Sequence, residues 1–239
     1  MFPPPASPCI GLCQLDPLTG LCAGCARSGP EIGAWRDGDA AFRAAVWEEI
    51  PARAPRLGLR AWLLPWGSEE ILGFLARSLK AGGACALGFG AAGVFRGPPD
   101  RVARDGDALL ALTATAGLRL EADPFARAFG APGGVVALGL PRARLGPAAA
   151  AAGPDARALR PQDRGAPLAD LGAARPGGRI SRRGAALVVE TPLGRVETPA
   201  GAAWDETALP PLPGVYSCCA LLLPAGGIPP ATGARRAGS

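Results

Sequence analysis

Apolar residues recur at helical spacing after residue 39. Phe42, Val46 and Ile50 lie four residues apart, so they would form one stripe on a helix that starts at Asp39. A shorter helix is predicted over residues 30–35, because it begins with a proline and can be capped by the serine two positions earlier or by the glycine between them. These helices offer few apolar residues, and a unit this small usually needs a metal ion or a disulfide for stability.

One strong helical pattern and several strand-like runs follow. The helix is predicted to start with Ser68 as its cap, to carry acidic residues in its first turn and to end at Gly82. Its apolar stripe consists of Ile71, Phe74, Leu75 and Leu79. Strands are predicted at residues 84–89, 108–112, 118–121, 135–140, 186–190, 195–198 and 215–223. One or two short helices are expected around residues 155–171. This mixture predicts the α+β fold class.

The domain boundary is expected near residues 54–60, where the helical pattern runs into a proline-containing stretch. Residues 1–55 would form a small helical four-cysteine module that binds a metal ion. Residues 56–223 would form a mixed α+β domain of unknown function. Residues 224–239 are rich in proline, glycine and polar residues, so we expect a disordered tail.

The amino-acid composition excludes more types of chemistry than types of fold. Glycine (35) and proline (27) are abundant among the 239 residues, but an apolar fraction of 49% argues against wholesale disorder. The chain has no histidine, which excludes Ser-His-Asp and Cys-His catalysis and all histidine-ligated metal sites. No secretory signal is visible at residues 1–7, and the longest nearly uncharged apolar run, residues 81–95, is too short to span a membrane. We therefore expect a cytoplasmic protein whose cysteines stay reduced.

Four of the seven cysteines lie close together, with the spacing Cys9-x3-Cys13-x8-Cys22-x2-Cys25. In a reducing compartment, clustered cysteines indicate metal ligands before disulfides. Residues 16–20 read as a turn that returns the chain for the second pair, and the helix predicted after Cys25 would favour thiolates through its positive end. The alternative is a set of structural cysteines without metal, such as disulfides in an exported protein.

The same residues resemble a known family. Residues 7–17 (SPCIGLCQLDP), residues 20–28 (GLCAGCARS), Glu31, Ile32 and Trp35 resemble the short bacterial domain of unknown function 1289, usually labelled a predicted iron-sulfur protein. The resemblance covers about residues 7–53, and Ser28 and Pro30 depart from the threonine and the acidic residue expected there. It implies metal binding by Cys9, Cys13, Cys22 and Cys25 and implies no reaction. No family is recognised in the rest of the chain.

The identity of the metal stays open on physical grounds. A tetrathiolate site suits a zinc ion, a single iron or an iron-sulfur cluster. The gaps of three and eight residues match neither common ferredoxin spacing, and the Cys-x2-Cys half is equally frequent in zinc knuckles. We therefore keep a zinc ion and an iron-sulfur cluster as the two expected cofactors.

The remaining candidate motifs have simpler structural interpretations. Cys85, Cys218 and Cys219 lie in apolar runs without basic neighbours, so we expect small core residues rather than nucleophiles. Residues 88–93 match the glycine pattern of a dinucleotide-binding loop, but residues 94–99 contain two prolines and cannot open the helix such a loop requires. A hairpin bend is the better interpretation.

The charge distribution bears on the partners. The net charge is +5, yet residues 1–55 carry four arginines against six acidic residues, so the predicted metal module is acidic. Binding to a phosphate backbone needs basic residues, and the arginine-rich residues 142–195 contain no aromatic side chain for stacking on bases. We expect no nucleic-acid partner and no membrane contact, and leave an unidentified protein partner open.

Two functions fit these features. The first is a non-enzymatic protein in which a mainly structural tetrathiolate site is fused to an interaction or sensing domain with an unknown ligand. The alternative is an iron-sulfur electron-transfer or redox protein that uses the same cysteines. No motif supports an enzyme, and we assign no catalytic residue and no further cofactor-binding residue.

Overall fold

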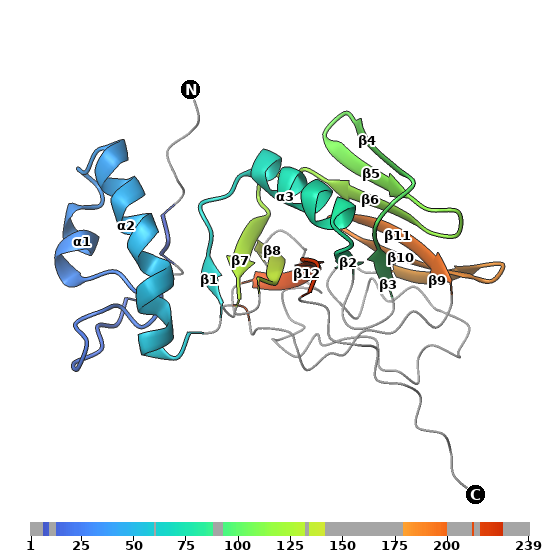
Figure 1. Cartoon of the computed structure of the whole chain (residues 1–239). Helices are drawn as coiled ribbons and strands as arrows, with labels where there is room; N and C mark the ends of the chain where they lie inside the picture. Colours follow the sequence, from blue (N-terminus) through green and yellow to red (C-terminus); the bar gives the residue numbers. More distant parts are fainter. Residues whose placement is uncertain are drawn as a thin grey trace, which may run out of the picture.

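The computed structural model describes residues 7–9, 13–59, 61–87, 93–131, 134–141, 179–199, 212 and 216–226. In this part of the chain a short helical region, α1 and α2, is followed by two antiparallel sheets and one further helix, α3. Figure 1 shows α1 and α2 beside β1, on the opposite side of the molecule from strands β4 to β6. The fold is mixed α+β, which confirms the predicted class, and it is rich in sheet.

The two N-terminal helices begin at caps that are visible in the sequence. Helix α1 (Gly29–Ala34) is capped by Ser28, and α2 (Ala40–Arg53) is capped by Asp39, whose carboxylate accepts a hydrogen bond from the N–H group of Phe42 at 2.8 Å. Helix α2 continues through Pro51, farther than the sequence indicated, and leads into the 3-10 helix Ala54–Leu57. A proline this close to the end removes only one backbone hydrogen bond of the helix.

Helix α3 (Ser68–Lys80) starts one residue earlier than predicted, because Gly67 and not Ser68 is its N-cap. The Glu70 carboxylate accepts a hydrogen bond from the Gly67 N–H group at 3.0 Å. The Ser68 hydroxyl instead donates to the carbonyl oxygen of Asp123 at 3.2 Å, which ties the helix start to the chain after β6. The predicted serine cap is therefore wrong, since that hydroxyl has a tertiary partner.

The strands form two six-stranded sheets in which every neighbouring pair is antiparallel. The first sheet has the order β1 (Trp62–Leu63), β7 (Arg127–Gly130), β8 (Val136–Pro141), β12 (Tyr216–Leu223), β2 (Ala84–Leu87), β3 (Gly93–Arg96). The second has the order β4 (Arg101–Asp105), β5 (Ala108–Leu112), β6 (Gly117–Glu121), β11 (Gly194–Pro199), β10 (Ala186–Thr191), β9 (Arg179–Arg183). Each predicted strand overlaps an observed one, whereas β1, β3, β4, β7 and β9 were not predicted.

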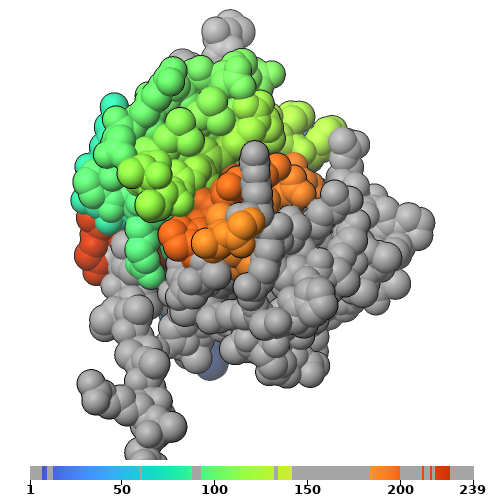
Figure 2. Space-filling model, turned by 90° about the vertical axis from the view of Figure 1, so that its right-hand side faces the viewer, coloured from blue at the N-terminus to red at the C-terminus, as the bar shows by residue number. Residues whose placement is uncertain are grey.

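Charged side chains of the second sheet pair with one another. Arg119 on β6 lies opposite Arg195 on β11 and forms an ion pair with Glu121, while Arg195 pairs with Glu190 and Glu197 at 3.3 Å each. Figure 2 shows β4 to β6 in green adjoining β10 and β11 in orange on this side of the molecule. These arginines are thus neutralised locally by carboxylates on the same or the neighbouring strand.

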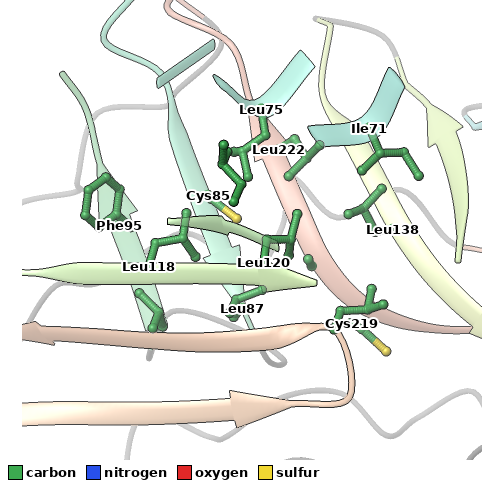
Figure 3. Close-up of a cluster of buried hydrophobic side chains, with 14 of the residues drawn as sticks. Ile71, Leu75, Cys85, Leu87, Phe95, Leu118, Leu120, Leu138, Cys219 and Leu222 are labelled. Atoms are coloured by element: carbon green, nitrogen blue, oxygen red, sulfur yellow. The ribbon is translucent and has the colours of Figure 1, made fainter. Parts of the chain in front are cut away.

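The main hydrophobic core lies between the two sheets and beneath α3. Ile71 and Leu75 of α3 meet Leu87 and Leu222 of the first sheet and Leu118 of the second, and Figure 3 shows these side chains pointing into one interior. The two sheets approach each other closely at Gly93, where a Cβ atom would lie 2.6 Å from the Val196 side chain. Only glycine allows this contact between β3 and β11.

A second hydrophobic cluster joins the N-terminal helices to the first sheet. It contains Val46, Trp47 and Ile50 of α2 together with residues of the sheet such as Leu63 and Phe129. These sheet residues alternate along their strands with those of the main core, so the first sheet is apolar on both faces. Helix α2 therefore shares buried side chains with the sheet across the expected domain boundary.

Several predicted segments lie outside the described residues. These are the short helices expected around residues 155–171 and most of the expected disordered tail, residues 227–239. Among the helices that the structure describes, none combines the length and the apolar character that crossing a bilayer requires.

Candidate metal centre

A tight turn that begins at Asp16 reverses the chain between the two cysteine pairs. The hydroxyl and the N–H group of Thr19 both donate to the Asp16 carboxylate at 2.8 Å, and these bonds lower the pKa of Asp16. Gly20 follows with a φ of 68°, in the left-handed region that glycine adopts readily. The chain then returns so that Leu15 and Cys22 form an antiparallel bridge. This confirms the turn that the sequence predicted here.

The second cysteine pair, Cys22 and Cys25, lies in a closed backbone turn. The Ala26 N–H group donates to the Cys22 carbonyl oxygen at 2.8 Å, and the Cys22 N–H group donates to the Arg27 carbonyl oxygen at 2.7 Å. Ala26 is fully buried and has a φ of 59°, which is uncommon for a residue with a side chain. Such strained positions persist where the surrounding structure fixes them, often at functional sites.

The sulfur of Cys22 is surrounded by hydrogen-bond donors. The side chain is fully buried, and burial alone would raise the pKa of this thiol. Backbone hydrogen bonds from Gly24, Cys25 and Gln14 outweigh that effect, so the pKa of Cys22 is lowered. The loop therefore favours the thiolate, which is the form of cysteine that binds metal ions.

Cys25 has a different environment, dominated by burial and by one arginine. Burial raises the pKa of Cys25, and the negative charge of Cys22 acts in the same direction. The Arg27 side chain opposes both, because its Nε–H group donates to the Cys25 sulfur at 3.4 Å and its positive charge favours the thiolate. Arg27 is itself only 3% exposed. The loop therefore holds a cation and a thiol together away from solvent.

The first cysteine pair is closer to solvent. Cys9 is partly exposed and Cys13 is exposed. The charge of Cys9 and a hydrogen bond between the two side chains raise the pKa of Cys13, with a smaller contribution from Cys22, while Arg27 lowers it. The four thiols are thus close enough to influence one another, as an inner buried pair and an outer pair.

Trp35, the C-cap residue of α1, covers the buried arginine. The centre of the Arg27 guanidinium lies 4.7 Å from the centroid of the Trp35 ring, within the range of a cation–π interaction. A second arginine, Arg43 of α2, lies 5.9 Å from the same ring and donates to the Trp35 carbonyl oxygen at 3.3 Å. Phe42 contacts the ring as well, with centroids 6.4 Å apart. The cysteine loop is therefore linked to both helices through one indole.

The start of α1 is held by its own capping interactions. The Glu31 carboxylate accepts a hydrogen bond from the Ser28 N–H group at 2.8 Å, and the Glu31 N–H group donates to the Ser28 hydroxyl at 3.4 Å. The sequence had indicated that the positive end of this helix would favour the thiolates. The donors found at the sulfurs are instead loop N–H groups and Arg27.

Two of the three remaining cysteines lie in the sheet core. Cys85 and Cys219 are fully buried in the cluster between the sheets, and burial raises the pKa of Cys85. This confirms that these two are core residues, whereas the side chain of Cys218 lies outside what the structure describes. Residues 94–96 continue into β3 and not into a helix, so the glycine pattern at residues 88–93 lacks the context of a dinucleotide-binding loop.

The four cysteine sulfurs are suitable ligands for a metal ion, although they do not converge on a common point. Within the described residues, no three Cys, Asp or Glu side chains converge as a metal site. The chemistry fits nonetheless, since four sulfurs from one short segment match the ligands that zinc and iron-sulfur clusters take. The sequence did not indicate that Arg27 belongs to this site. The only signal for it was the position of a basic residue two places after Cys25.

Comparison with known proteins identifies the N-terminal segment alone. No curated protein and no solved structure matches the chain. One family model matches, described as a protein of unknown function, DUF1289, and it covers residues 7–54. This range contains all four clustered cysteines, Arg27, Trp35 and both N-terminal helices. Residues 7–54 are therefore a domain of the DUF1289 family, joined to a sheet-rich region for which no family is recognised.

Proposed function

We propose that residues 7–54 bind a metal through the thiolates of Cys9, Cys13, Cys22 and Cys25. The observation that carries the proposal is the environment of the Cys22 sulfur, which is buried yet has a lowered pKa because backbone N–H groups donate to it. An ordinary core cysteine such as Cys85 has its pKa raised by burial. A loop that stabilises a buried thiolate is suited to a cation.

The occupant would be a zinc ion or an iron-sulfur cluster with a mainly structural role. Four protein thiolates complete a tetrahedral shell and leave no open coordination position for a substrate. The helices α1 and α2 bury few side chains of their own, so the bound metal would add the stability that burial does not provide. The sheet region, which shares a hydrophobic cluster with α2, would supply an interaction or sensing function with an unidentified ligand.

A second candidate is electron transfer by an iron-sulfur cluster at the same cysteines. The observation that favours it is the exposure of Cys13 and the partial exposure of Cys9, which would leave one edge of a cluster close to solvent. Solvent exposure and hydrogen bonds to sulfur both set the reduction potential of such a cluster.

The test is the metal content of protein purified without oxygen from unsupplemented cells. We expect nearly one equivalent of zinc, or iron together with acid-labile sulfide, in the natural protein. Cys25→Ser should lose this metal, while Cys85→Ala should keep it, because Cys85 lies in the sheet core. A brown colour that bleaches with dithionite would select the redox candidate. Natural protein that contains essentially no zinc and no iron would rule out both.

A further inference from the structure

Arg27 is unusual among the described residues, because it is a charged side chain that is almost fully buried, at 3% exposure. Other arginines of the same region, such as Arg43 and Arg53, are only partly buried. Burying a cation is costly unless an opposite charge and hydrogen bonds compensate for the lost water. The contacts of Arg27 should therefore show which anion it serves.

Among the described residues, a cysteine sulfur is the group that compensates the buried charge of Arg27. The Arg27 Nε–H group donates to the Cys25 sulfur at 3.4 Å, and among the described ion pairs no carboxylate is joined to Arg27. The buried cation is thus in direct contact with one thiol of the inner pair.

The backbone and the stacking contacts fix this cation in place. The Arg27 carbonyl oxygen accepts the Cys22 N–H group at 2.7 Å, and the guanidinium lies 4.7 Å from the centroid of the Trp35 ring. An arginine held at both ends in this way is pre-organised, since its planar group has little freedom left to lose. A site with four thiolates and a divalent ion carries a net charge of about −2, which a fixed buried cation would partly offset.

We infer that Arg27 is the positioning residue of the thiolate site, which orients the Cys25 sulfur and compensates the negative charge of the bound metal complex. This inference rests on the proposed metal-binding function and adds a residue to it. Partners of this kind, which contact a ligand but not the metal, commonly change metal affinity by about 10- to 100-fold. Trp35 then serves to hold the guanidinium over the loop.

The test uses Co²⁺ as the probe, added to metal-free, reduced full-length protein and followed by its sulfur-to-cobalt charge-transfer absorption. Arg27→Gln should weaken Co²⁺ affinity by about 10- to 100-fold. It should also move the charge-transfer band to longer wavelength, because a sulfur without its hydrogen bond gives up electron density more easily. If Arg27 had a purely structural role, the Co²⁺ complex of the variant would keep the band position of the natural protein.

The matched control is Arg43→Gln, which removes the other arginine at Trp35; the hydrogen bonds that the structure describes for Arg43 go to the carbonyl oxygens of Trp35 and Arg36 and not to a cysteine. We expect its affinity and band position to equal those of the natural protein. If Arg27→Gln does not fold, Arg27→Lys takes its place, and it should weaken affinity and shift the band in the same direction. Natural affinity and band position in a folded Arg27 variant would overturn the inference while leaving the metal proposal intact. Natural protein that fails to bind Co²⁺ would overturn both.

Discussion

Glu31 and Arg53 join the start of α1 to the end of α2. Both Glu31 carboxylate oxygens accept hydrogen bonds from Arg53 Nη1, at 2.9 and 2.8 Å, and both side chains are about one-fifth exposed or less. The same carboxylate caps α1 through the Ser28 N–H group. One side chain therefore fixes the helix next to the cysteine loop and sets its position against the longer helix.

Glu31→Gln should lower the free energy of unfolding by about 1–2 kcal/mol at pH 7, since it removes charge-assisted hydrogen bonds from a partly buried site. Urea unfolding followed by tryptophan fluorescence would measure this. Glu49→Gln is the matched control, because Glu49 contacts the same arginine at 3.6 Å but is 60% exposed. Equal losses in the two variants would contradict the specific role of Glu31.

The contribution of Glu31 should depend on pH in one direction. Burial would raise the pKa of Glu31, but hydrogen bonds from Ser28 and Arg53 and the charge of Arg53 prevail, so its pKa is lowered. A carboxylate whose pKa is lowered in the folded state stabilises the protein at pH values above its pKa in the unfolded state, which is about 4.3. This stabilisation is lost as the pH falls through the pKa of the folded state. The natural protein should therefore exceed Glu31→Gln in free energy of unfolding by the largest amount at pH 6–7, and this difference should shrink below about pH 4.

The N-cap of α2 gives a second test of the helical region. Asp39→Ala should lower the free energy of unfolding by about 1 kcal/mol, because the Phe42 N–H group loses the carboxylate that now accepts its hydrogen bond at 2.8 Å. Asp39→Asn keeps an acceptor at the same place and should cost clearly less. Helical circular dichroism during thermal unfolding would compare the two. Identical melting of both variants and the natural protein would show that this cap contributes nothing.

Cys22→Ser should destabilise the N-terminal region without unfolding the sheets. The substitution removes one ligand of the proposed metal and a thiol that three backbone N–H groups surround. Hydrogen exchange read by mass spectrometry should show faster exchange over residues 13–59 and unchanged protection in β5 and β6. Cys85→Ala should give the opposite pattern, since Cys85 lies between the sheets. Unchanged protection of residues 13–59 in Cys22→Ser would count against a structural metal.

Local signals made the helices predictable from sequence. Ser28 and Asp39 cap the helices that they precede, and the apolar stripe of α3 is continuous. Strands such as β4 and β7 carry arginines at their first positions and little alternation, so their pairing with neighbours, rather than their composition, defines them. Strand β1 contains two residues, too few to form any pattern.

The candidate site was predictable in its ligands but not in what surrounds them. The spacing of the four cysteines identifies the thiols, whereas the donors that act on Cys22 are backbone groups, which no side-chain pattern reveals. The burial of Arg27 depends on Trp35, eight residues away, and on the left-handed turn at Ala26. A sequence with arginine as its dominant basic residue offers no local reason to single out this one.

The contact between the two sheets gives the last prediction. A Cβ atom at Gly93 would lie 2.6 Å from the Val196 Cγ1 atom and 2.8 Å from the Val189 Cβ atom, closer than such atoms can approach. Gly93→Ala should therefore force β3 away from β10 and β11 and lower the free energy of unfolding by about 1–3 kcal/mol. Gly33→Ala is the control, because nothing lies within 4 Å of its added Cβ atom in α1 and alanine favours a helix. Urea unfolding of both variants would measure the difference, and a Gly93→Ala protein as stable as the natural one would show that the sheets can separate without loss.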